Sequence, residues 1–121
     1  MLFGTAARIQ QGMLDRFRSL EAELDEHREE YEALNERFGV RAHSVWASRQ
    51  LDGTPIAVNL YDIEPEGLKA MAQRVWDLAS PYDRWWVGWV RDIYGIDLVG
   101  GPSHAGPPEP VLAWRRDRDS G

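Results

Sequence analysis

The chain contains no cysteine, which excludes disulfides, thiolate metal sites and cysteine nucleophiles together. Lysine is almost absent too, since Lys69 is the only one among fourteen basic residues. No stretch of about 18 successive apolar residues occurs, and the first ten residues lack the basic and apolar segments of a secretory signal. These absences predict a soluble cytoplasmic protein without a membrane partner.

A surplus of positive charge is also missing. The net charge is −6, and residues 15–37 alone hold nine acidic residues against four basic ones. Attraction to phosphate backbones or to anionic membranes requires the opposite balance. We therefore expect no nucleic-acid partner, and we attribute the acidity to the solvent-facing side of one helix.

Recognised catalytic and cofactor motifs are missing as well, including phosphate-binding glycine loops, zinc signatures and serine-hydrolase elbows. Glu23 and Glu30 lie one helical turn on either side of His27, but a metal site needs at least three converging ligands. We predict no metal and no cofactor. A core or interface position explains His27 more simply than a ligand role does.

Hydrophobic spacing predicts most of the secondary structure. An apolar run over residues 2–9 indicates a first strand. Apolar residues spaced by threes and fours over residues 13–38 predict one long helix ended by Gly39, and their heptad spacing also permits a coiled coil. Residues 65–79 predict a second helix, with Pro65 in its first turn.

Tryptophan is present in excess, with six in 121 residues. Ser80 and Pro81, with Asp83 as a variant capping-box partner, predict the start of a third helix. Helical spacing then places its three tryptophans on one face, for which we expect core packing, with direct substrate contact as the alternative. The three tryptophans are Trp85, Trp86 and Trp89.

Asp52-Gly53 lies between two β-rich runs and is a strong hairpin signal. A loop of two or four residues would place Val45 opposite Leu60 on an aliphatic face. The other face would then combine aromatic and hydrogen-bonding groups, which suits a ligand cavity or a polar subunit interface. The residues predicted for that second face are Ser44, Trp46, Asn59 and Tyr61.

These positions supply the candidate chemistry. Asn59 and Tyr61 can hydrogen-bond a carbonyl or a developing enolate, beside Ser44 and the flat apolar wall of Trp46. The same pairing places His43 opposite Asp62, an arrangement that suits a general base. The alternative is a ladder of partly exposed ion pairs, in which Arg41 faces Glu64.

The predicted order of elements, β-α-β-β-α-α-loop-β, is that of an α+β, ferredoxin-like split βαβ sheet with helices on one face. Residues 1–99 form this predicted domain. Seven of the eleven residues 100–110 are Gly or Pro. We expect a loop there, followed by a possible last strand in "VLAWRR" and a polar tail ending at residue 121.

Residues 2–95 resemble the dimeric α/β-barrel superfamily of the antibiotic-biosynthesis-monooxygenase (ABM) type, and most closely its small uncharacterised members. The resemblance is carried by "QQGMLDRF", "EHREEYEAL" and "SPYDRWW". Two histidines of the family pattern are replaced here by Ser80 and Trp86. It implies a homodimer in which the uncovered sheet faces of two copies close a barrel around the pocket.

The resemblance also implies a function in specialised metabolism. Superfamily members include cofactor-independent monooxygenases, cyclases and isomerases, so we expect a protein that binds a hydrophobic aromatic or polyketide-like molecule. In such an enzyme Asn59, Tyr61 and His43 with Asp62 would be catalytic, and Ser44, Trp46 and the tryptophans of the third helix would bind substrate. The alternative function is a non-catalytic homodimeric binding or protein-interaction module.

Overall fold

The computed structural model describes residues 1–99 and confirms the α+β class. The sheet contains three antiparallel strands in the order β1-β3-β2. In chain order the elements are β1 (Leu2–Arg8), α1 (Leu14–Arg18), α2 (Leu20–Asp25), α3 (Arg28–Phe38), β2 (Ala42–Arg49), β3 (Pro55–Asp62), α4 (Pro65–Ala72) and α5 (Pro81–Tyr94). The predicted last strand and polar tail lie outside the described residues.

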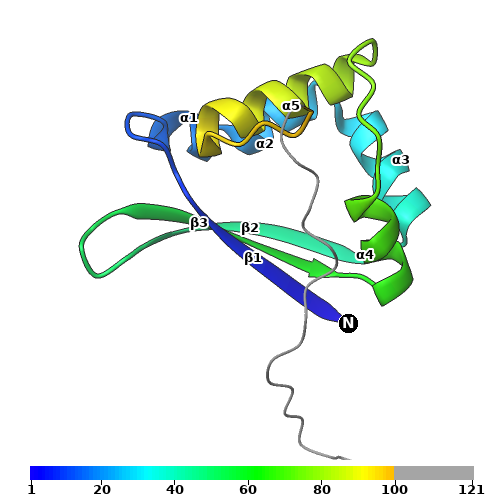
Figure 1. The fold of residues 1–121 in the computed structure, drawn as a ribbon, viewed down its shortest axis with the longest axis horizontal. Helices are drawn as coiled ribbons and strands as arrows, with labels where there is room; N and C mark the ends of the chain where they lie inside the picture. Colours follow the sequence, from blue (N-terminus) through cyan, green and yellow to red (C-terminus); the bar gives the residue numbers. More distant parts are fainter. Residues whose placement is uncertain (100–121) are drawn as a thin grey trace, which may run out of the picture.

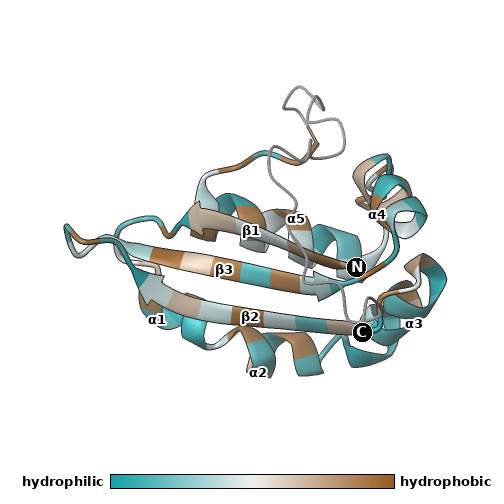
Figure 2. Ribbon diagram, turned by 90° about the horizontal axis from the view of Figure 1, so that it is seen from below, coloured by the Kyte–Doolittle hydropathy of each residue, from teal (hydrophilic) through white to brown (hydrophobic). Residues whose placement is uncertain are grey.

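The molecule has two layers. Helices α1, α2, α3 and α5 lie on one side of the sheet, and α4 follows the end of β3 (Figure 1). The opposite face of the sheet carries no helix of the described part and is turned toward the viewer in Figure 2. Because β3 lies between β1 and β2, the connection from β1 through the helices to β2 forms a split βαβ unit, consistent with the ferredoxin-like class.

The predicted long helix is wrong, because the segment is divided into α1, α2 and α3. Helical geometry is interrupted at Ser19 (φ −89°, ψ 9°) and at His27 (φ −127°, ψ 19°). The Ser19 hydroxyl donates to the Asp15 carbonyl at 3.1 Å, a local bond that competes with helix hydrogen bonds. Gly39 ends α3 in the left-handed conformation (φ 71°), as predicted.

The second helix is shorter than predicted, because α4 ends at Ala72. The chain that follows is held by Asp83, whose carboxylate accepts hydrogen bonds from the Arg74 side chain and from the Asp77 backbone N–H at 2.9 Å. The Ser80-Pro81 start of α5 is confirmed, but the capping box is wrong. Ser80 donates instead to Glu30 of α3 at 3.3 Å.

The hairpin is confirmed, but its predicted pairing is wrong by one residue. Val45 pairs with Asn59, and Trp46 pairs with Val58. The loop has three residues rather than two or four, because the Gly53 N–H donates to the Gln50 carbonyl at 2.9 Å and Gly53 adopts a left-handed conformation (φ 88°). Side chains alternate between the two faces of a strand, so a shift of one residue in the pairing changes which residues of β2 and β3 lie on the same face.

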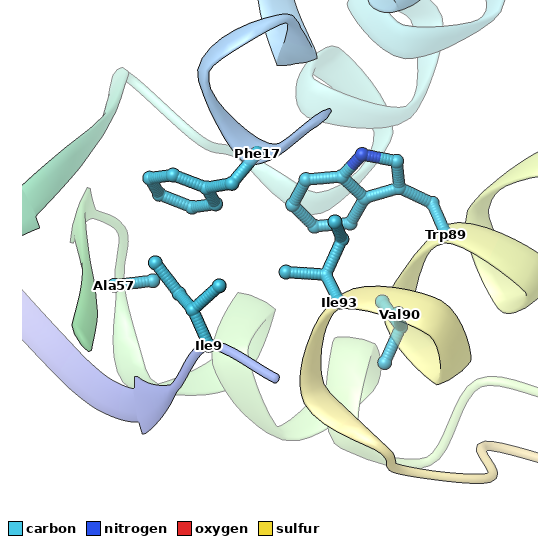
Figure 3. Packing of buried hydrophobic residues seen from close by; sticks show 6 residues of the cluster. All are labelled: Ile9, Phe17, Ala57, Trp89, Val90 and Ile93. Atoms are coloured by element: carbon cyan, nitrogen blue, oxygen red, sulfur yellow. The ribbon is translucent and has the colours of Figure 1, made fainter. Parts of the chain in front are cut away.

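The core lies between the sheet and α5, where Trp89 is fully buried (Figure 3). Trp86 stacks on Trp89 with ring centroids 5.2 Å apart, and Phe17 of α1 packs against Trp89 with centroids 6.1 Å apart. The predicted core packing of α5 is therefore confirmed for Trp89, while Trp85 and Trp86 are half-buried and pack against this core. The core residues are Ile9, Phe17, Ala57, Trp89, Val90 and Ile93.

Candidate functional site

The corrected pairing divides the predicted ligand-binding face between the two sides of the sheet. His43 pairs with Tyr61, and Asn59 lies on the same inner face, beneath the helices. Ser44 and Trp46 lie on the open face, where the Trp46 indole donates to the Ser44 hydroxyl at 2.9 Å. The predicted group of four residues is therefore not brought together.

The predicted pairing of His43 with Asp62 is also wrong. Asp62 pairs with Ala42 and belongs to the open face. Its carboxylate accepts a hydrogen bond from Arg41 at 2.9 Å, and Arg41 also contacts Glu64 at 2.8 Å. This guanidinium lowers the pKa of both carboxyl groups. The alternative prediction of a partly exposed ion-pair ladder describes this edge of the sheet correctly for Arg41 and its two partners.

A cavity of about 160 Å³ lies between the inner face of the sheet and the helices. Strands β2 and β3 contribute one residue each, and the rest come from α2 to α5 and the segment after α4. Most of its wall is apolar or aromatic, as in pockets for small organic molecules. The apolar lining is Leu20, Leu24, Leu34, Phe38, Met71, Trp76 and Trp86, and the polar lining is Tyr31, Asn35, His43, Tyr61, Arg74 and Tyr82.

His43 is the centre of the polar part of this wall. Its Nδ1 lies 2.7 Å from the Tyr31 hydroxyl, and its Nε2 lies 3.3 Å from the Asn59 side-chain oxygen. The imidazole stacks on the Tyr61 ring with centroids 4.1 Å apart and planes 5° from parallel. Burial lowers the pKa of His43, and the hydrogen bond to Asn59 opposes this only in part, so the imidazole is neutral at pH 7.

The other titratable groups of the wall leave it without net charge. Burial raises the pKa of Tyr61 and raises that of Tyr82 to about 12, so both phenols stay protonated at pH 7. Arg74 is paired with the buried carboxylate of Asp83, and its guanidinium lies 4.3 Å from the centre of the Trp76 ring. A neutral molecule therefore suits this cavity better than an ion.

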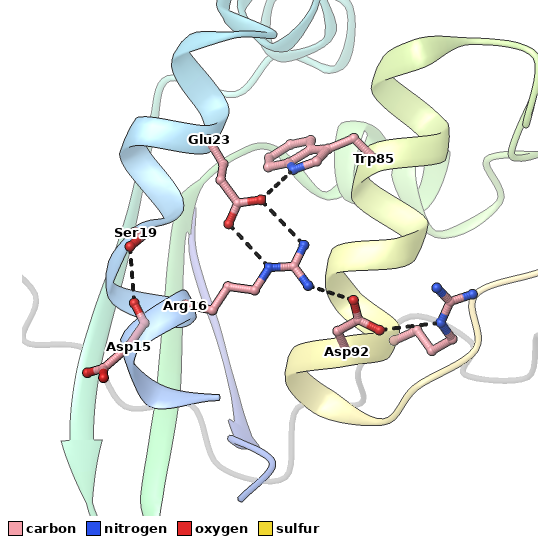
Figure 4. Close-up of polar contacts among 7 residues, drawn as sticks. Asp15, Arg16, Ser19, Glu23, Trp85 and Asp92 are labelled. Atoms are coloured by element: carbon pink, nitrogen blue, oxygen red, sulfur yellow. Dashed lines mark hydrogen bonds and ion pairs between the residues drawn. The ribbon is translucent and has the colours of Figure 1, made fainter. Parts of the chain in front are cut away.

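The three tryptophans of α5 have different environments. Trp86 lines the cavity, whereas Trp89 belongs to the core. Trp85 stacks on His27 at 4.8 Å and donates to Glu23 of α2 at 3.2 Å. Figure 4 shows Arg16 between Glu23 and Asp92, so this ion-pair cluster joins α1 and α2 to α5.

Several cavity residues were not predicted as site residues, above all Tyr31 of α3 and Arg74 after α4. Tyr31 does carry a signal, because it is a polar-tipped aromatic residue within an otherwise apolar stripe, and buried tyrosines usually have a hydrogen-bond partner. Arg74 carries none, because the sequence pattern placed it within a helix that ends before it.

No protein-family model matches the chain, and neither the curated proteins nor the solved structures contain a match. The fold and the site therefore define only a class, an α+β domain with an aromatic-lined cavity between its sheet and its helices. Within residues 1–99, no group of three acidic or histidine side chains is placed to hold a metal ion. None of the helices in that range is long and apolar enough to cross a membrane.

Proposed function

We propose that the protein binds a small, neutral, single-ring aromatic molecule in the cavity between the sheet and the helices. The observation that carries this proposal is the combination of a volume of about 160 Å³ with a largely aromatic wall and one hydrogen-bonded polar chain. A cavity of about 150 Å³ accommodates one benzene molecule. The volume therefore favours a single ring over a polycyclic, polyketide-like substrate.

A cofactor-independent cyclase, isomerase or oxygenase activity is the catalytic form of this proposal. His43 and Tyr61 would then face the bound molecule, because both line the cavity, and Asn59 would act through its hydrogen bond to His43. Among the described residues His43 has no carboxylate partner, and its environment disfavours the charged imidazolium. This favours binding and polarisation over strong base catalysis.

Ligand binding is tested by filling the cavity. Leu34→Phe adds bulk to the lining, while Leu60→Phe makes the same change on the open face. Toluene, phenol and indole are titrated against each protein, with tryptophan fluorescence and thermal unfolding as readouts. A ligand at about a hundred times its Kd should stabilise the wild type by about 2.7 kcal/mol. Leu34→Phe should abolish this effect and Leu60→Phe should keep it; equal responses in both variants contradict the proposal.

We also propose that a second copy of the chain covers the open face of the sheet. Leu2, Trp46 and Leu60 are 82%, 58% and 42% exposed there. This face is turned toward the viewer in Figure 2, and its charged residues, Arg8 and Asp62, lie at the strand ends. Exposed large apolar residues gathered on one sheet face are characteristic of an interface. A two-fold arrangement of two such sheets is the dimeric barrel implied by the resemblance to the ABM superfamily.

Native mass spectrometry and light scattering at micromolar concentration test this assembly. Trp46→Asp places a charge on the open face in the middle of β2 and should yield a monomer. Leu51→Asp is the matched control, because Leu51 is fully exposed in the hairpin loop, outside the strands. It should remain dimeric. A monomeric wild type contradicts the dimer, and capture of a different protein by this face would favour the interaction-module alternative.

A further inference from the structure

The hydrogen bonds around His43 determine which chemical group a ligand must present to the cavity wall. Asn59 makes one of these contacts, and its side-chain oxygen lies 3.3 Å from His43 Nε2. The side-chain oxygen of Asn59, not its amino group, therefore faces His43 and is the acceptor in this bond.

This orientation determines the tautomer of His43. A carbonyl oxygen only accepts, so His43 Nε2 carries the proton and donates it to Asn59. The neutral imidazole has one N–H, so its Nδ1 must accept. The Tyr31 hydroxyl, 2.7 Å away, is therefore the donor to Nδ1.

Tyr31 thus uses its single proton inside the wall and presents its oxygen to the cavity only as an acceptor. Asn35 has both a donor and an acceptor, and the Tyr61 and Tyr82 hydroxyls rotate to serve as either, so these groups do not discriminate between ligands. The other polar lining residues already have partners, since Tyr31 donates to His43, His43 also contacts Asn59, and Arg74 is paired with Asp83.

We infer that the cavity selects single-ring aromatic molecules that carry a hydrogen-bond donor, such as a phenolic hydroxyl or an aromatic amine, whose O–H or N–H is accepted by the Tyr31 oxygen. This inference rests on the proposed function and makes its ligand class specific. A ligand without a donor leaves a desolvated acceptor unpaired, which is costly. Tyr31, whose proton is donated to His43, therefore disfavours aromatic ethers and aldehydes that only accept relative to molecules that donate.

The ligand test compares phenol with toluene, which has nearly the same shape, and with benzaldehyde, which only accepts. Affinities are measured by calorimetry for the wild type and for Tyr31→Phe. The ratio of phenol affinity to toluene affinity should fall roughly three- to tenfold in Tyr31→Phe, while toluene binding is retained. An unchanged ratio overturns the inference but leaves the proposed cavity intact, whereas a wild type that binds none of the three overturns both.

A second variant reverses the polarity of the wall. His43→Leu removes the acceptor for the Tyr31 proton, which then becomes available to a ligand. Benzaldehyde should gain affinity relative to phenol by roughly three- to tenfold in this variant. If His43→Leu leaves that ratio unchanged, the committed proton of Tyr31 is not the origin of selectivity and the inference is overturned.

The tautomer is measured without any ligand. Long-range proton–nitrogen correlation spectra of the full chain report which imidazole nitrogen carries the proton, and loss of the signal in His43→Gln assigns it. The expected result is a neutral ring protonated at Nε2. A ring protonated at Nδ1 would make the Tyr31 hydroxyl the acceptor of that bond and would overturn the inference even if phenol binds.

Discussion

The two faces of the sheet are built from alternate residues of the same three strands, yet they solve opposite problems. The inner face buries polar groups whose hydrogen bonds are made. His43, for example, is hydrogen-bonded to both Tyr31 and Asn59. The open face exposes apolar ones, with Trp46 58% and Leu2 82% accessible to solvent. A buried polar group is tolerated when its hydrogen bonds are made, and an exposed apolar surface is characteristic of an interface. Polarity alone therefore does not identify the covered face.

The largest difference between the faces is expected from their tryptophans. Trp89→Ala leaves a void beside Phe17 and Trp86, and should lower the free energy of unfolding by about 4 kcal/mol at every protein concentration. Trp46→Ala should cost little at low concentration and progressively more as the concentration rises, because its stabilising contacts would be made in the dimer. Denaturant unfolding over a concentration series distinguishes the two.

Trp89→Phe sharpens this first comparison. The indole Nε1 of Trp89 is buried, and the described residues provide no hydrogen-bond partner for it. Removing that N–H recovers part of the cost of losing the larger ring. The loss should therefore be well below that of Trp89→Ala. Equal losses of unfolding free energy in Trp89→Phe and Trp89→Ala would show that the unpaired indole N–H does not destabilise the folded state.

A somewhat smaller effect is expected where a buried ion pair supports the cavity wall. Asp83→Asn leaves the Arg74 guanidinium without its carboxylate and should cost about 3 kcal/mol. Asp92→Asn is the matched control, because this carboxylate also binds an arginine, Arg16, but its side chain is 39% exposed. We expect less than about 1 kcal/mol there. Similar losses in thermal or urea unfolding would contradict the distinction.

The parts of this fold that were predictable depend on local chemistry. Ser80-Pro81 begins α5, and Gly39 ends α3, because caps and helix ends are decided by a few neighbouring residues. Asp52-Gly53 identified the hairpin for the same reason. The length of its loop was not predictable, because it depends on Gly53 as the third loop residue, and that one residue changed which side chains share a face.

The parts that were not predictable depend on tertiary packing. The break at His27 coincides with the stacking of its ring on Trp85 of α5, a contact that no local pattern contains. The cavity joins Tyr31 of α3 to His43 of β2, and only the folded arrangement shows that these two residues meet. Of the predicted site residues, His43, Asn59 and Tyr61 share the inner face of the sheet, whereas Ser44, Trp46 and Asp62 lie on the other face.

The stability of the protein should depend on pH through His43 on the inner face. Burial lowers the pKa of His43 below its ordinary value of 6.5, so below that pH the unfolded chain binds the imidazole proton more readily than the folded one. The contribution of His43 is complete above pH 6.5 and is lost as the pH falls toward the folded-state pKa. Between about pH 7 and pH 5 the wild type should lose more stability than His43→Gln. Parallel profiles in chemical denaturation would contradict a neutral, buried His43.

The smallest effect is expected at the edge of the open face, where Arg41 binds Asp62 and Glu64. Arg41 and both carboxylates are solvent-accessible, so screening and side-chain entropy offset the attraction. Arg41→Gln should leave the unfolding midpoint at pH 7 unchanged within error in dilute, monomeric protein. The two carboxyl groups have lowered pKa values, so any contribution of the pairs is present above pH 4.5 and is lost as the pH falls through the folded-state values. A clear loss that appears only at high protein concentration would indicate that a second copy covers this edge, because burial strengthens an ion pair that solvent otherwise screens.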